Sequence, residues 1–182
     1  PGPAAVCYPR GTGVGAQINT EMAILPLGQA EVVAEYGTAP YAVSILAFGS
    51  RVYPCMAVAE QLAEQLNIAV RVVNMRYVKP IDHHMIRQCA LDSDLLVTVE
   101  EHAVMAGAGS AVNESIVAQS LSVSCLNIGL PDQFLAQATP AQMLASVGLD
   151  EVGIFHQIKQ RYQSLTEQAE HDKISAKVFA SQ

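Results

Sequence analysis

Four strand-length apolar runs alternate with segments of helical period over residues 42–165, and this alternation limits the possible folds more than any other feature. The runs are AVSILAF, VRVVNMRYV, DLLVTVE and VSCLNIGL. Between them, apolar residues recur every three or four positions, which is typical of amphipathic helices. Parallel strands need connections long enough to hold a helix. We therefore predict an α/β fold, with a mostly parallel twisted sheet and helices on both faces.

The chain divides into four parts. Residues 1–11 hold a short apolar run and then a Pro-Arg-Gly turn, so we expect the end of an upstream element. Residues 12–41 are interrupted by glycines and prolines and predict an extended linker with one hairpin. Residues 42–165 form the main domain. Residues 166–182 are polar, and we expect this tail to fray.

Composition excludes several classes of protein. A formal net charge of −7 disfavours a nucleic-acid surface, which needs clustered Lys and Arg. The apolar runs are shorter than the roughly 20 residues that span a bilayer, and no signal peptide pattern is present. The four cysteines are far apart and lack C-x-x-C spacing, which is typical of a reducing compartment. We predict a soluble, cytoplasmic protein without a nucleic-acid or membrane partner.

Polar residues follow the predicted strands, at the edge where ligands collect in parallel sheets. A ligand site and an interface between domains or subunits are both compatible with this set. No single reaction requires these residues, so we favour an interface that includes Glu100, Glu101 and His102. Strand alternation sends Glu100 and Glu101 to opposite faces, which predicts a surface role for His102. The full set is Ser50, Lys79, Glu100, Glu101, His102 and Asp132.

The glycine turn GAGSAV at 107–112 departs from the dinucleotide fingerprint, because Val112 stands where a third small residue should pack. No G-x-x-x-x-G-K-[ST] run is present either. The helix that follows could still bind an anion at its first turn. We favour a structural alternative, in which Gly107 and Gly109 allow positive φ and Ser110 caps the helix.

No residue pattern predicts a metal centre or a catalytic residue. His83 and His84 would point about 100° apart on a helix, so they cannot share one metal as an i, i+4 pair does. No cysteine or serine has an evident base beside it. Arg10 follows Pro9 on a stiff turn, and from the residues alone a phosphate or a carboxylate is an equally good partner for it.

Five segments together resemble the carboxy-terminal part of the 1-deoxy-D-xylulose-5-phosphate synthase family, which is similar to the transketolases. The similarity extends from residue 1 to about 163, and the tail over 164–182 extends beyond the family's usual end. The segments are YPRG at 8–11, LAFGS at 46–50, RYVKPID at 76–82, LLVTVEEHAVMAGAGSAVNE at 95–114 and LNIGLPDQF at 126–134.

The resemblance implies an enzyme of isoprenoid precursor synthesis. Members join pyruvate to glyceraldehyde 3-phosphate with loss of carbon dioxide, use thiamine diphosphate and Mg²⁺, and are homodimers of three-domain subunits. Residues 1–11 would end the pyrimidine-binding domain, and residues from 42 onward would form the third domain. The arginine of the family's YPRG motif binds the substrate phosphate, which implies that role for Arg10.

The family's cofactor-binding GDG motif and its activating glutamate have no counterpart in these 182 residues. We therefore expect a fragment that neither binds thiamine diphosphate nor turns over substrate alone. Two residues depart from the family pattern: Cys7 replaces an arginine and Ala106 replaces a glycine. The alternatives are a non-catalytic dimerisation module and the carboxy-terminal domain of a 2-oxo acid dehydrogenase beta chain, although NIGLPD disfavours the latter.

Overall fold

The computed structural model describes residues 2–6, 13, 15, 20, 21 and 23–180, with the backbone alone for 174–180. Its five strands form one sheet in the order β1-β3-β2-β4-β5. Strands β2 to β5 are parallel, and β1 pairs antiparallel with β3. The predicted α/β fold with a mostly parallel sheet is confirmed. The strands are β1 Glu31–Tyr36, β2 Tyr41–Ala47, β3 Val70–Asn74, β4 Ser93–Ala103 and β5 Ser124–Leu130.

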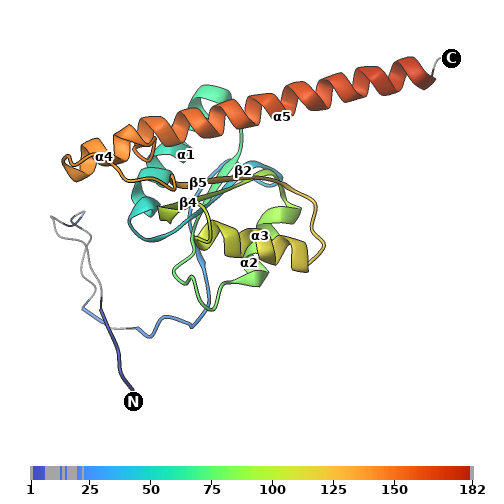
Figure 1. Cartoon of the computed structure of the whole chain (residues 1–182). Helices are drawn as coiled ribbons and strands as arrows, with labels where there is room; N and C mark the ends of the chain where they lie inside the picture. The colour runs from blue at the N-terminus through green and yellow to red at the C-terminus, as the bar shows by residue number, and fades with distance from the viewer. Residues whose placement is uncertain (1, 7–12, 14, 16–19, 22, 181–182) are drawn as a thin grey trace.

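Helices cover both faces of this sheet (Figure 1). Helices α1 (Val52–Leu66) and α5 (Glu151–Ala180) lie over one face, and α2 (His83–Leu91) and α3 (Ala108–Ala118) lie over the other. A short turn, η1 (Gly49–Arg51), precedes α1, and α4 (Pro140–Ser146) precedes α5. Asp82 caps α2, because its side chain accepts a hydrogen bond from the amide of Met85.

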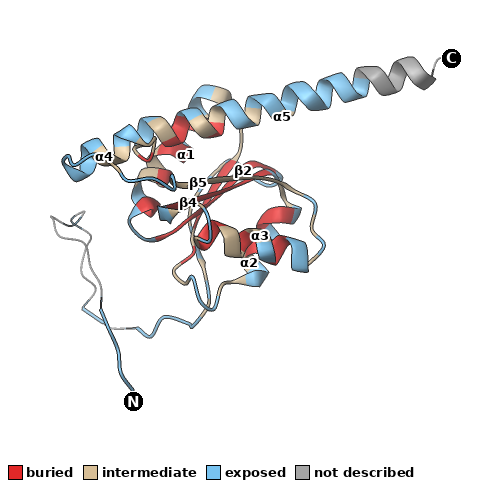
Figure 2. Ribbon diagram, in the orientation of Figure 1, coloured by how far each residue is buried: buried red, intermediate tan, exposed pale blue. Residues whose placement is uncertain are grey.

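Strand β2 is the centre of the core and is buried along its whole length (Figure 2). Its side chains alternate between two apolar clusters. Val43 and Ile45 belong to the cluster beneath α1 and α5, and Leu46 belongs to the cluster beneath α2 and α3. A strand buried on both faces has no solvated side, which explains the uninterrupted apolar run in its sequence.

The structure differs from the sequence prediction at both ends of the main domain. Residues 31–36, within the predicted linker, form strand β1 and join the sheet instead of a separate hairpin. Their alternating EVVAEY pattern suits an edge strand with one partner. At the other end, α5 continues through the predicted tail to Ala180. Glu, Gln, Ala and Lys, which favour helices, make up much of that segment.

The connections form a topological switch point at the carboxyl ends of the parallel strands. Neighbouring strands β2 and β4 lead into α1 and α3, which lie on opposite faces. Ligands of open α/β sheets bind at such a switch point. Since β1 is antiparallel, its first residue, Glu31, pairs with Asn74 at the end of β3. The chain therefore enters the sheet at this same carboxyl edge.

Candidate functional site

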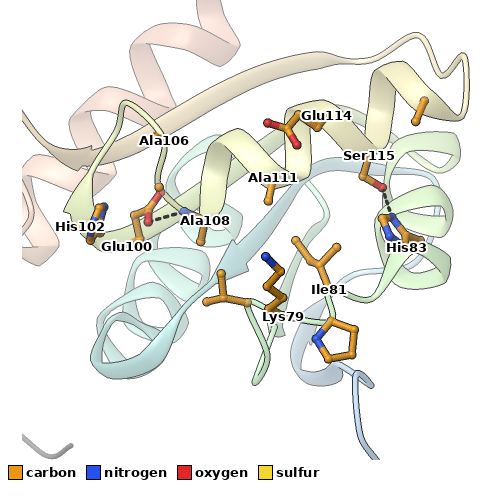
Figure 3. Close-up of a pocket in the computed structure, with 14 residues that line it drawn as sticks. Lys79, Ile81, His83, Glu100, His102, Ala106, Ala108, Ala111, Glu114 and Ser115 are labelled. Carbon is orange, nitrogen blue, oxygen red and sulfur yellow. Dashed lines mark hydrogen bonds between the residues drawn. The ribbon is translucent and has the colours of Figure 1, made fainter.

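A groove of about 780 Å³ opens beside the carboxyl ends of β3 and β4. The loop at 78–81 forms one wall, and the turn after β4 together with α3 forms the other (Figure 3). Three of the predicted edge residues, Lys79, Glu100 and His102, line it. Ser50, Glu101 and Asp132 do not. The remaining polar lining residues are His83, Glu114 and Ser115.

Glu100 closes the first turn of α3. Its side chain is 4% exposed, and its two oxygens accept hydrogen bonds from the amides of Ala108 at 2.7 Å and Gly109 at 2.8 Å. A carboxylate here satisfies two free N–H groups and stabilises the positive end of the helix dipole. The anion at the start of α3 is thus the protein's own carboxylate, and the turn is not a phosphate-binding loop.

The predicted cap at Ser110 is wrong. The N-cap residue is Gly107, which has no side chain that could cap the helix. The Ser110 hydroxyl instead donates to the carbonyl of Val104. Ser110 already lies inside the helix, one turn too late to serve as the N-cap. The capping oxygens come from eight and nine residues earlier in the chain, beyond the range of local capping patterns.

The glycines of this region permit close approach rather than positive φ. Gly107 has φ −81°, and a Cβ there would lie 2.6 Å from both carboxylate oxygens of Glu100. At Gly109 a Cβ would lie 2.6 Å from Thr98 Oγ1 and Asn127 Nδ2. The predicted positive φ at Gly107 is therefore wrong. The left-handed residue of the turn is Ala106, with φ 59°, a conformation that favours glycine.

Gly109 lies against side chains that form two successive hydrogen bonds. Asn113 on α3 donates to Asn127 Oδ1 on β5 at 2.8 Å, and Asn127 donates to Thr98 Oγ1 on β4 at 2.7 Å. These bonds attach the first turns of α3 to two strands. Asn113 Oδ1 is buried without a hydrogen-bond partner among the described residues.

Glu101 points to the opposite face from Glu100, as predicted from strand alternation. Its carboxylate forms a 2.6 Å ion pair with Arg51, which also donates to the Leu149 carbonyl at 2.9 Å. Arg51 is 9% exposed, so this contact fixes η1 to the segment before α5. Glu100 and Glu101 therefore both stabilise local structure, on different faces.

The structure gives little support for acid–base chemistry by the two histidines that line the groove. His102 is exposed, and its Nδ1 lies 3.2 Å from the carbonyl of Ala103. His83 Nδ1 lies 2.7 Å from Ser115 Oγ on α3, a contact visible in Figure 3. Among the described residues, no three His, Cys, Asp or Glu side chains are grouped to hold a metal ion.

Two buried cysteines are poor nucleophiles. Burial raises the pKa of the Cys55 thiol to about 12 and that of Cys89 to about 11. The thiolate, which is the reactive form, is therefore disfavoured at neutral pH. Both side chains belong to the apolar clusters.

Lys79 extends from the 78–81 loop toward α3 (Figure 3). Within the described part of the chain it takes part in no salt bridge. Arg10, the predicted phosphate ligand, lies outside the described residues, as does Cys7. The role of Arg10 stays a prediction. No helix among the described residues is long and apolar enough to cross a membrane.

Comparison with known proteins decides the family. A model described as the transketolase C-terminal domain matches residues 28–154. The chain belongs to this family. The match begins before β1, which agrees with the position of that strand in the sheet and extends the domain beyond the predicted start at residue 42.

The chain is also similar to one part of several bacterial synthases. It is 51% identical over 162 residues to the 1-deoxy-D-xylulose-5-phosphate synthase of Acinetobacter baumannii, covering 88% of this chain and 25% of that protein. It is 48% identical over 160 residues to the synthase of Nitrosospira multiformis, covering 88% and 24%. The chain therefore spans about a quarter of the length of these relatives.

Solved structures agree on the fold. A protein described as a split gene transketolase, inactive beta4 tetramer, superposes with a TM-score of 0.68 at 29% identity, covering 76% of this chain and 44% of that one. The transketolase of Leishmania mexicana gives a TM-score of 0.54 at 17% identity, covering 76% and 18%. The latter supports the fold alone.

Proposed function

We propose that this chain serves as the carboxy-terminal domain of a 1-deoxy-D-xylulose-5-phosphate synthase. The observation that carries the proposal is its 51% identity to the Acinetobacter baumannii synthase over 162 residues. The complete enzyme would condense pyruvate with glyceraldehyde 3-phosphate, with loss of carbon dioxide, for isoprenoid precursor synthesis. This chain would contribute structure and one phosphate ligand to that reaction.

The described residues do not fit a thiamine diphosphate and Mg²⁺ site. They contain no cluster of metal-ligating side chains. The amides at the start of α3 already donate to the carboxylate of Glu100 and are not free to bind a diphosphate. We infer that the cofactors bind to parts of a synthase that this chain does not match. Isothermal titration of the purified chain with thiamine diphosphate and Mg²⁺ should show no binding, and micromolar binding would contradict this inference.

The proposal is tested by a chimera in which this chain replaces the matched quarter of the Acinetobacter baumannii synthase. The chimera should form 1-deoxy-D-xylulose 5-phosphate from pyruvate and glyceraldehyde 3-phosphate. The isolated chain should form none in the same coupled assay. A folded chimera without turnover would contradict the proposed function, and turnover by the isolated chain would contradict its dependence on the rest of the enzyme.

Arg10 is proposed to bind the substrate phosphate. In the chimera, Arg10→Ala removes a charge-assisted contact and should raise the KM for glyceraldehyde 3-phosphate by about tenfold or more. The matched control is unphosphorylated glyceraldehyde, whose kinetics should not change between the two proteins. An equal loss with both substrates would assign Arg10 a structural role.

A second candidate function is self-association without catalysis. It is favoured by the structural similarity to the protein described as an inactive beta4 tetramer. Sedimentation of the purified chain over a range of concentrations tests it, because a monomer at every concentration would remove this candidate.

A further inference from the structure

Three successive loops at the carboxyl edge of the sheet each expose a large apolar side chain. Val78 follows β3 and is 52% exposed, Met105 follows β4 and is 71% exposed, and Phe134 follows β5 and is fully exposed. Isolated exposed apolar residues are normal, but several on adjacent loops are typical of an interaction surface.

The loops that carry these three side chains border two hollows. The groove beside α3 is lined by Val78 and Ala106, the neighbour of Met105. A second hollow, of about 380 Å³, is lined by Ala103 and Phe134. Residues of the turn at 103–107 thus line both hollows, and the amide of Val104 in this turn donates to the Leu130 carbonyl at 3.0 Å. We call this surface, from Val78 through Met105 to Phe134, the loop surface.

The chain that precedes β1 arrives at the margin of the loop surface. The amide of Ala30 donates to Asp82 at 2.8 Å, and a Cβ on Gly28 would lie 3.0 Å from the side chain of Pro80. Just before this anchor, Ile24 is 97% exposed and Leu27 is 73% exposed. A part of a synthase joined to this segment would therefore enter beside the 78–81 wall of the groove.

The polar groups of the edge indicate what kind of partner fits. Glu100 and Glu101 are already satisfied by α3 and Arg51, so their charges are not free for a ligand. Lys79 extends into the groove without a carboxylate partner among the described residues. A matching surface would be apolar opposite the three loops and would place an acidic group near Lys79.

We propose that the loop surface is where the rest of the synthase packs against this domain. The inference rests on the proposed function and deepens it, because it replaces the general interface predicted around Glu100, Glu101 and His102 with a defined apolar surface. The occupant is the portion of the synthase that the chain does not match, rather than a second copy or a small ligand.

Backbone hydrogen exchange measured on the isolated chain and on the chimera tests this placement without using activity. In the chimera, amides at 78–81, 103–107 and 132–135 should exchange about tenfold or more slowly, because packing removes local opening. Amides of the opposite edge, at 67–69 and 91–92, should exchange equally in both proteins. Unchanged exchange at the three loops would overturn the proposal, as would protection in the isolated chain that grows with its concentration.

Substitution separates this inference from the proposed function. Met105→Glu with Phe134→Glu should lower the activity of the chimera by about tenfold or more, because two charges are buried against an apolar partner. Leu91→Glu with Val117→Glu is the control, since Leu91 is 66% and Val117 is 77% exposed away from these loops. Both isolated double variants should unfold at the same temperature as the unmodified chain. An active chimera that tolerates both pairs equally would overturn the inference alone, and an inactive chimera with protected loops would overturn the function alone.

Discussion

The two edges of the sheet are closed by different means. At the amino edge, Arg71 is 2% exposed, contacts both oxygens of Asp92, bonds to Ser44 Oγ and lies 4.5 Å from the centre of the Tyr41 ring. The hydroxyl of Tyr41 in turn donates to Glu35. At the carboxyl edge, Arg51 is paired with Glu101, but the most deeply buried charge is Glu100, and among the described residues its partners are backbone amides.

This difference indicates which end of the sheet satisfies its buried charges without a partner surface. Paired side chains satisfy one another at the amino edge, so that edge needs no partner. Around Glu100, closure of the carboxyl edge depends on backbone amides and on glycines at close contacts. The loops of this edge also leave Val78, Met105 and Phe134 exposed. An edge of this second kind is suited to contact a partner surface.

The largest effect should come from breaking the amino edge. Arg71→Ala leaves Asp92 and the Ser44 hydroxyl without their charged partner and should lower the free energy of unfolding by about 3–5 kcal/mol. Urea unfolding followed by circular dichroism measures the loss. The double variant Arg71→Met with Asp92→Leu should recover part of it, because no lone charge remains. A loss below about 1 kcal/mol in the single variant would show that the Arg71–Asp92 pair does not stabilise this edge.

Removal of Glu100 tests the carboxyl edge. Glu100→Ala leaves two amides of α3 without acceptors and should cost about 2–3 kcal/mol of unfolding free energy. The matched control is Glu114→Ala, which removes an exposed carboxylate of the same helix and should change the unfolding free energy by at most about 0.5 kcal/mol.

Added acetate should raise the melting temperature of Glu100→Ala and leave the unmodified chain unchanged, because the vacated helix start can bind an anion. Equal losses in the Glu100 and Glu114 variants would show that capping does not stabilise the turn.

Ala106 offers a smaller test of the same turn. Its φ of 59° is unfavourable for a residue with a Cβ. Ala106→Gly should therefore stabilise the chain by about 1 kcal/mol, as judged by urea unfolding. The control is Ala111→Gly inside α3, which should destabilise by about 1 kcal/mol. Destabilisation by Ala106→Gly would mean that the turn is not strained.

Local patterns predicted much of the fold, and their failures have a common cause. Short-range periodicity predicts the four parallel strands and the opposite directions of Glu100 and Glu101. Strand β1 was missed because it is an exposed edge strand whose register shifts between Val32 and Ala34.

The error at the candidate site was of the same kind. The cap of α3 was assigned to Ser110 because capping rules consider neighbours within one turn, while the actual acceptor is Glu100, at the end of the preceding strand. A glutamate after a buried strand, followed by closely spaced glycines, is the signal that could have found it. Long-range contacts of this type appear only once the strand and helix are packed.

The smallest expected effect concerns whether water is excluded from the interior of the amino edge. Cys89 lies against this edge, and burial raises the pKa of its thiol from 9.0 to about 11, with Arg71 acting in the opposite direction. The unfolded chain therefore loses the thiol proton first, and stability should fall as the pH rises from 9 toward 11. Cys89→Ala removes this contribution, so its unfolding free energy should fall less steeply over the same range than that of the unmodified chain. Parallel pH profiles for the two proteins would mean that water reaches Cys89, and the amino edge would then be no more tightly closed than the carboxyl edge.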